Sequence, residues 1–331
     1  MTFFEEIKKE TKRRKSLFIV FFLVFFPLVS FFIIRAVSQE EEIKDENKVI
    51  EEVEPYPVLR DREEEGKDPN IKGSAALSIY WDGNSEKILY KENPDKPLPI
   101  ASISKLMTAL VVLEDYDLDA PVGIAEKEII TRSEFRDFRA FKETKVEEMV
   151  YPMVIESNNS AAFALALAGE RFFDDISNEP VKGFVEKMNN KAREIGLKKT
   201  NFVNPSGLDG RSGEYNLSTA REITEFSKYL LSNTDIFKIS QMPSYRLYSP
   251  DGAIYYESLN TNDFLHSKEE DWQERIVGGK TGWTHAAFGC LLLVLESPSH
   301  EGYIINIVLG TEDRFHEMGK MVDYIHNAYE F

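Results

Sequence analysis

The apolar positions of the chain follow three patterns, and the first is an unbroken run near the amino terminus. Ser16 to Ile34 carry no charge over about 19 residues, close to the ~20 that a helix needs to cross a bilayer. Lysines and arginines precede the run and an acidic stretch follows it, so the positive-inside rule predicts that the chain beyond Ile34 lies outside the cytoplasm. We therefore expect a cytoplasmic basic segment over 1–15 and a transmembrane signal anchor over 16–37.

A cleaved signal peptide is the alternative interpretation of this run. Ala36, Val37 and Ser38 form a small-x-small sequence of the kind that signal peptidases cleave. The apolar run is longer than the about 7 to 15 residues usual in signal peptides, which favours a retained anchor.

The second pattern is a stretch without any apolar face, over residues 38–72. It is dense in Glu, Asp and Lys and contains Pro55, Pro57 and Pro69, so it is too hydrophilic to bury a surface. Like charges along such a chain repel and extend it. The composition predicts an extended acidic linker, rather than a binding tail, with the folded domain beginning near Gly73.

The third pattern, over 73–331, alternates between strand and helix periodicity. Short alternating runs at 75–80 and 87–90 flank an Asp-Gly turn and predict a β-hairpin. Strand-length apolar runs return near the carboxyl end, and the segments between have apolar residues at helical spacing. We predict a mixed α/β domain in which one antiparallel sheet, built from both chain ends, is packed by helices and joined to a helical subdomain. The further strands are expected at 288–295 and 303–309, and the helices after Ser102 and at 145–155, 161–172, 181–195, 219–231 and 314–329.

Charge and cysteine content exclude several function classes. The chain has 40 Lys and Arg against 57 Asp and Glu, a net charge of −17 that repels phosphate backbones, so we expect no nucleic-acid partner. Cys290 is the single cysteine, which rules out an intrachain disulfide and a cysteine-based zinc cluster. We predict neither a metal nor a cofactor.

Candidate chemistry begins at Ser102-Ile103-Ser104-Lys105, an S-x-x-K pattern. One helical turn places the lysine amine beside the serine hydroxyl. A lysine whose pKa is lowered by burial or by a nearby positive charge can remove the hydroxyl proton and make the serine a nucleophile. Alone the pattern is weak, because a serine helix cap beside a surface lysine has the same sequence.

Two further motifs follow in order along the chain. Ser157-Asn158-Asn159 lies on a tight connection between two predicted helices, where its residues could equally be helix caps. Lys280-Thr281-Gly282 precedes a strand-like run. There an ammonium and a hydroxyl suit a carboxylate, and the glycine lets a ligand approach the backbone. An edge strand protected by a lysine is the alternative for this third motif.

The three motifs in this order resemble penicillin-binding proteins and serine β-lactamases. The similarity is greatest to the low-molecular-mass D-alanyl-D-alanine carboxypeptidases, and it covers 73–331. Segments at 99–108, 184–189 and 200–208 also look like that family's sequences. The resemblance implies a β-lactamase/transpeptidase-like fold, with peptidoglycan stem peptides as substrates and β-lactams as covalent inhibitors.

The resemblance also implies roles for the catalytic residues. Ser102 attacks the carbonyl between two D-alanines, the terminal D-alanine leaves, and water hydrolyses the acyl-enzyme. Lys105 takes the serine proton, Ser157 relays a proton toward the leaving amine, and Asn159 binds the peptide chain of the substrate.

The remaining positions are implied to bind substrate. Lys280 and Thr281 bind the terminal carboxylate beside Gly282, and Arg314 is a further carboxylate anchor. The backbone N–H groups of Ser102 and Trp283 form the oxyanion hole.

The chain departs from better-known members at three places. Asn158 stands where glycine is frequent, Trp283 stands where histidine is common, and 128–145 lacks the glycines expected near the second motif. The same motifs also serve a D,D-endopeptidase that cuts peptidoglycan crosslinks, or a non-catalytic penicillin-binding sensor or scaffold. A class A β-lactamase is disfavoured, because no E-x-x-L-N segment lies between Asn159 and Lys280.

Overall fold

The computed structural model describes residues 57–59, 69–122, 144–168, 179–210, 212–248, 252–266 and 271–331. The predicted basic segment, the anchor and most of the linker lie outside these residues, as does nearly all of 128–145. No helix in the described part of the chain is both long and apolar enough to cross a bilayer.

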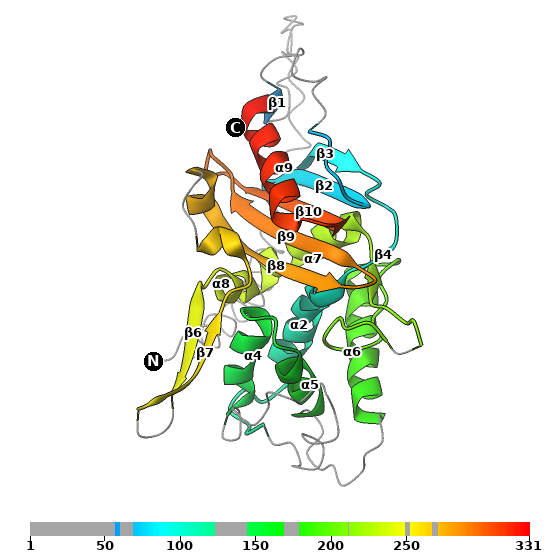
Figure 1. The fold of residues 1–331 in the computed structure, drawn as a ribbon, viewed down its shortest axis with the longest axis vertical. Coiled ribbons are helices and arrows are strands. Elements are labelled where there is room, and N and C mark those ends of the chain that lie inside the picture. The colour runs from blue at the N-terminus through cyan, green and yellow to red at the C-terminus, as the bar shows by residue number, and fades with distance from the viewer. Residues whose placement is uncertain are drawn as a thin grey trace, which may run out of the picture. The chain divides into compact units, whose positions relative to one another are not determined.

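A five-stranded antiparallel sheet forms the centre of the unit Pro55–Phe331 (Figure 1). Its spatial order is β3-β2-β10-β9-β8, so both chain ends contribute, as predicted. A buried polar pair fixes one register: Ser78 Oγ donates to Asn306 Oδ1 at 2.7 Å, across paired residues of β2 and β10. The strands are β2 (Ala75–Trp81), β3 (Glu86–Glu92), β8 (Ile276–Thr284), β9 (Phe288–Glu296) and β10 (Tyr303–Thr311).

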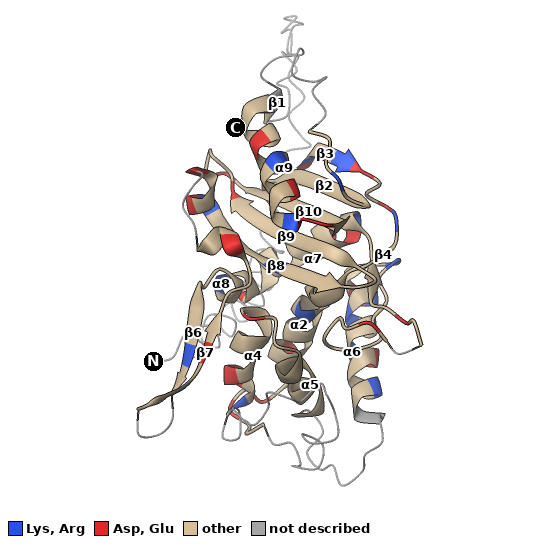
Figure 2. Ribbon diagram, viewed as in Figure 1, with Lys and Arg blue, Asp and Glu red and all other residues tan. Residues whose placement is uncertain are grey.

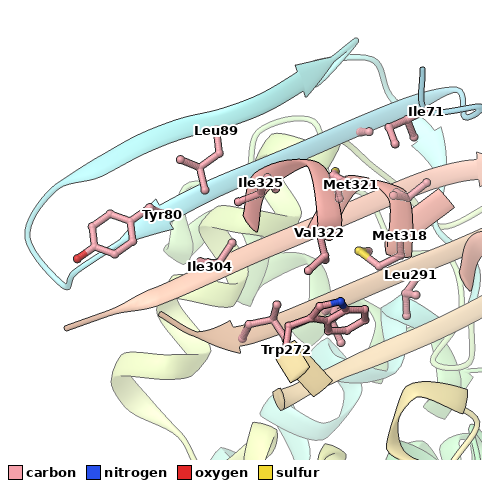
Figure 3. Packing of buried hydrophobic residues seen from close by; sticks show 14 of the residues in the cluster. Ile71, Tyr80, Leu89, Trp272, Leu291, Ile304, Met318, Met321, Val322 and Ile325 are labelled. Atoms are coloured by element: carbon pink, nitrogen blue, oxygen red, sulfur yellow. The ribbon is translucent and has the colours of Figure 1, made fainter. Parts of the chain in front are cut away.

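Helices cover the two faces of this sheet. Helix α9 (Arg314–Ala328) lies on one face, and its apolar residues pack with alternate residues of β9 and with Trp272 (Figure 3). Helix α7 (Ala220–Asn233) packs against β2 and β10 from the other face. Figure 2 shows β9 and β10 almost free of charged residues, as strands buried on both faces should be.

A helical subdomain lies below the sheet in Figure 1 and surrounds α2 (Lys105–Asp115). Every residue of α2 from Lys105 to Val112 is buried, because neighbouring helices pack around it. Two short strands, β4 (Leu98–Pro99) and β5 (Leu217–Ser218), pair with each other just before α2 begins. The surrounding helices are α4 (Val146–Val154), α5 (Asn159–Ala168) and α6 (Glu179–Ile195).

Two features differ from the sequence predictions. Val58 and Leu59 pair as β1 with the carboxyl-terminal strand β11 (Tyr329–Glu330), and Ile71 is 4% exposed in the core. These contacts place part of the predicted 38–72 linker inside the folded unit, ahead of Gly73.

The second difference is a hairpin of β6 (Ser244–Tyr248) and β7 (Ile254–Leu259), which projects beside α4 and α8 (Ile236–Ser240). The sequence did not predict it because its strands bury little: Leu247 is buried, while Arg246 pairs with Glu257 across the hairpin. The apolar alternation that signals a strand is therefore missing.

Candidate active site

The segment that carries Ser102 is an irregular turn between strand β4 and helix α2. Ala101 to Ser104 form a 3-10 turn, η1, and Ala101 adopts φ 47°, a left-handed conformation that is costly for a residue with a side chain. The Ser104 hydroxyl donates to the Ala101 carbonyl at 2.7 Å and holds the turn. Ser102 itself is partly exposed, while Ala101, Ile103 and Ser104 are buried.

Two glycines allow this turn to lie close to other backbone. A Cβ at Gly207, whose φ is 84°, would lie 1.9 Å from the Ala101 carbonyl oxygen. A Cβ at Gly282 would lie 3.0 Å from the Ser102 nitrogen. The glycine of the third motif thus brings β8, an edge strand, directly against the nucleophile turn.

Lys105 is fully buried and is held by three fixed partners. Its Nζ lies 2.9 Å from Ser102 Oγ, and it donates to Asn159 Oδ1 at 2.8 Å and to the Ser206 carbonyl at 2.5 Å. Burial, and secondarily the charge of Lys280, hold the pKa of Lys105 well below its usual value.

These contacts determine where the lone pair of a neutral Lys105 amine points. A neutral amine has two N–H donors and one lone pair. Asn159 Oδ1 and the Ser206 carbonyl can only accept, so they take the two N–H groups. The lone pair is left for the Ser102 hydroxyl, which then donates its proton to Lys105.

The second motif forms the loop between α4 and α5. Asn159 is the first residue of α5, and Ser157, two residues earlier, has φ 64°. Asn158 has a structural role, since its Oδ1 accepts from the Ala161 N–H at 2.9 Å and caps α5. Its Nδ2 donates to the Tyr256 hydroxyl at 3.3 Å, which ties the loop to the β6–β7 hairpin. Asn158, at a position where better-known members of the resembled family often have glycine, therefore holds the loop in place through these two hydrogen bonds.

Two cationic side chains, Lys280 and Arg314, form a cationic pair near the nucleophile turn. Lys280 is 2% exposed and donates to the Thr281 carbonyl at 3.1 Å. Burial, and then the positive charge of Arg314, lower the pKa of Lys280 to about 7. Arg314 is close enough to act on Lys280 in this way, and its buried Nε has no hydrogen-bond partner among the described residues. Two neighbouring cations, one of them with a buried N–H that lacks a partner among the described residues, would suit an anionic ligand.

Trp283 follows Gly282 on β8. The residue is 52% exposed, and its ring is in edge contact with the His285 ring, with the two centroids 5.1 Å apart. The described residues contain no group of three or more His, Cys, Asp or Glu arranged to hold a metal ion.

Sequence reasoning missed three contributions to the site. The Ser206 carbonyl holds Lys105, and Gly207 makes room for the Ala101 carbonyl. Asn159 was expected to bind substrate, but its Oδ1 also accepts from Lys105. The family-like sequence at 200–208 was the available signal, but a backbone acceptor leaves no side-chain pattern.

Replacing Gly207 by alanine should disrupt the nucleophile turn. The new Cβ would collide with the Ala101 carbonyl and would also impose a left-handed conformation on alanine, which costs roughly 1–2 kcal/mol by itself. We expect a lower melting temperature and a penicillin acylation rate reduced by about tenfold or more, measured by stopped-flow or gel labelling.

Gly213→Ala is the matched control for this variant. Gly213 has φ 83°, but a Cβ added there would have only the Tyr215 hydroxyl within 4 Å. The control should therefore lose stability without losing acylation rate. Equal acylation rates in the two variants would contradict the close packing proposed for Gly207.

Comparison with known proteins identifies the family to which this chain is similar. The family model described as D-alanyl-D-alanine carboxypeptidase matches residues 63–313, which contain all three motifs. The D-alanyl-D-alanine endopeptidase of Pseudomonas aeruginosa is 32% identical over 232 residues, which are 66% of this chain and 66% of that protein. The D-alanyl-D-alanine carboxypeptidase DacF of Bacillus subtilis is 29% identical over 265 residues, 77% of this chain and 63% of that protein.

A solved structure extends the similarity to the fold. Penicillin-binding protein D2 of Listeria monocytogenes, in its ampicillin-bound form, superposes with a TM-score of 0.61 at 27% identity, covering 78% of this chain and 100% of that one. The chain spans about two thirds of the length of the two curated relatives described above. The predicted transpeptidase-like fold is thereby confirmed. Because the family match takes in most of the chain and all three motifs, the protein belongs to the D-alanyl-D-alanine carboxypeptidase family of serine peptidases, S11.

Proposed function

We propose that this chain removes the terminal D-alanine from peptidoglycan stem peptides through an acyl-enzyme on Ser102. The observation that carries the proposal is the environment of Lys105, whose Nζ contacts Asn159 Oδ1, the Ser206 carbonyl and Ser102 Oγ. In the neutral amine the first two, which can only accept, take the two N–H groups, and the lone pair is left for the Ser102 hydroxyl. This amine can take the serine proton without moving.

The chemistry then proceeds in two steps. As the Ser102 oxygen bonds to the carbonyl carbon, its proton passes to Lys105, and the backbone N–H groups of Ser102 and Trp283 stabilise the oxyanion. Ser157 relays that proton from Lys105 to the departing D-alanine amine as the peptide bond breaks, which leaves Lys105 neutral. Water next attacks the ester, Lys105 takes a proton from that water and returns it to Ser102 Oγ as the ester bond breaks, and the free acid leaves.

The cationic pair gives the reaction its substrate class. Buried Lys280 and half-buried Arg314 supply positive charge, and Thr281 supplies a hydroxyl. A peptide ending in a free carboxylate is attracted there, which places the last peptide bond over Ser102. β-Lactams, which also carry a carboxylate, are expected to acylate the same serine.

A D,D-endopeptidase is the second candidate function. It is favoured by the names of relatives, since the Pseudomonas aeruginosa protein at 32% identity is described as a D-alanyl-D-alanine endopeptidase. The same nucleophile and base serve both cuts, so the geometry of Ser102 and Lys105 does not separate them.

Muropeptide digestion distinguishes these functions. The purified chain would be incubated with monomeric pentapeptide muropeptides and with crosslinked dimers, and the products analysed by mass spectrometry. Loss of one D-alanine from monomers supports the carboxypeptidase, and conversion of dimers to monomers supports the endopeptidase. Penicillin labelling without either product would support the non-catalytic sensor or scaffold.

We also propose that the protein stays in the membrane with its catalytic domain outside the cytoplasm. Support comes from the sequence alone: the uncharged run from Ser16 to Ile34, the basic residues before it and the acidic residues after it. In fractionated cells the full chain should sediment with membranes and stay there after high-salt washing. External protease should digest the domain in cells whose outer layers have been opened.

A variant that lacks residues 1–37 and carries a cleavable signal peptide is the control, and it should be found in the soluble fraction. Recovery of the natural chain in the soluble fraction, with an amino terminus near Gln39, would contradict retention and support cleavage.

A further inference from the structure

A second threonine hydroxyl lies against the third motif. Thr261 is part of the short connection between β7 and the 3-10 turn η4 (Asp263–Leu265), and its Oγ1 lies 2.5 Å from Thr281 Oγ1. Thr281 is 4% exposed, while Thr261 is partly exposed. Neither the motifs nor the family resemblance drew attention to Thr261.

The connection that carries Thr261 is held firmly in place. Asn260 Nδ2 donates at 2.8 Å to the carbonyls of Ser240 and Met242, and Asn260 Oδ1 accepts from the Asn262 N–H at 2.9 Å. The Thr261 N–H donates to the Ile155 carbonyl at 3.1 Å, just before the second-motif loop. A β-branched side chain on a fixed backbone has few rotamers, so the Thr261 hydroxyl has a defined position.

The same connection is linked to the cationic pair. Asp263, two residues beyond Thr261, acts electrostatically on Arg314, and Arg314 acts in turn on Lys280. Thr261 itself contacts the third motif through Thr281 and the end of α4 through Ile155.

The contact between the two hydroxyls leaves one proton for a ligand. Each hydroxyl has a single O–H donor, and one of the two donors is used in the contact between them. A carboxylate can only accept. If Thr261 donates to Thr281, the Thr281 proton is directed to the carboxylate, and the chain of two hydrogen bonds strengthens the outer one.

We infer that Thr261 is a positioning residue of the carboxylate site, which orients the Thr281 hydroxyl proton toward the terminal carboxylate of the substrate. The inference rests on the proposed function, because it assigns Thr281 to that carboxylate. It adds a residue from outside the three motifs, and it makes carboxylate recognition depend on a pair of hydroxyls.

Thr261→Val tests this role, because valine keeps the shape and loses the hydroxyl, and Thr261→Ser is the control that keeps it. On a diacylated L-lysyl-D-alanyl-D-alanine, the Val variant should raise KM by about tenfold with kcat within about twofold, since the lost contact acts on binding. The Ser variant should remain close to the wild type. Thr261→Val should add little to Thr281→Val, because both changes break one hydrogen-bond chain.

The readout specific to carboxylate positioning is a substrate without that group. On the same peptide with a C-terminal amide, the wild type should be slow, and Thr261→Val should cause no further loss. An equal loss on acid and amide would show that Thr261 only supports the fold, and an unchanged KM on the acid would also overturn the inference.

Acylation by benzylpenicillin and by its methyl ester repeats the comparison without D-alanine release. If the wild type is acylated but releases no D-alanine, the carboxypeptidase proposal fails, while a Val defect limited to the free acid still supports Thr261. If the Val variant reacts with both β-lactams as the wild type does, the inference fails even where D-alanine release is found. Absence of any acylation of the wild type would overturn both.

Discussion

Replacing Ser102 by alanine should abolish covalent labelling by penicillin and all release of D-alanine, while the fold remains intact. The change removes one oxygen from a partly exposed residue, the second of a turn whose shape depends on other contacts. Lys105 keeps its acceptors on Asn159 and Ser206, so its buried amine is not left without partners. Intact mass spectrometry after exposure to penicillin measures the covalent labelling, and a thermal melt measures whether the fold is intact.

Ser104→Ala is the matched control, since it removes a hydroxyl from the same motif. The Ser104 hydroxyl is buried and donates to the Ala101 carbonyl, so its loss should lower stability by about 1 kcal/mol and leave labelling stoichiometry unchanged. Full labelling of Ser102→Ala, or loss of labelling only in Ser104→Ala, would move the nucleophile away from Ser102.

Periodicity predicted the elements that bury a continuous apolar face. The strand predicted at 303–309 is observed as Tyr303–Thr311, and the helix predicted at 314–329 as Arg314–Ala328. Such elements are visible in the sequence because packing forces one pattern on every residue of the buried face. The exposed β6–β7 hairpin has no such constraint, and cross-strand charges replace the apolar signal.

In the site, the side chains that belong to motifs could be predicted from the sequence, whereas the backbone groups and a side chain outside the motifs could not. The lysines of the first and third motifs were predicted, and the structure buries both of them near one another. The Ser206 carbonyl could not have been predicted, because every residue has one and only the fold selects which is used. Thr261 was equally hidden, since its partner Thr281 is 20 residues away and no motif spans that distance.

Replacing Lys280 by glutamine should weaken the reaction and also change its pH dependence, because Lys280 acts on two partners. Removing one member of a buried, hydrogen-bonded charge pair costs about 2 to 5 kcal/mol, so kcat/KM for a carboxylate substrate should fall roughly 30-fold or more. The second effect is on Lys105. Its pKa is lowered mainly by burial and additionally by the charge of Lys280.

The signs of the two limbs in a plot of kcat/KM against pH follow from these pKa values. Lys105 acts as a base only when neutral, so activity rises with pH as Lys105 loses its proton, which gives the acid limb. Lys280 attracts the carboxylate only when charged, so activity falls as pH rises through its pKa of about 7, which gives the basic limb. The pH optimum lies between the two.

Glutamine at position 280 should move the acid limb and remove the basic limb. Without a neighbouring positive charge, Lys105 holds its proton more firmly, its pKa rises, and the acid limb moves to higher pH. Burial of Lys105 is unchanged, so the pKa stays below the usual value for lysine. The basic limb near pH 7 should disappear, because glutamine has no proton to lose in that range.

Lys280→Arg is the control that keeps the charge. A guanidinium remains protonated throughout the accessible range, so the acid limb should stay where the wild type has it while the basic limb extends to higher pH. Acylation rates by penicillin from about pH 5 to 10 would be measured for the three proteins. An acid limb that stays in place in the glutamine variant would mean that Lys280 anchors the carboxylate without acting on Lys105, and that burial alone keeps Lys105 neutral enough to serve as the base.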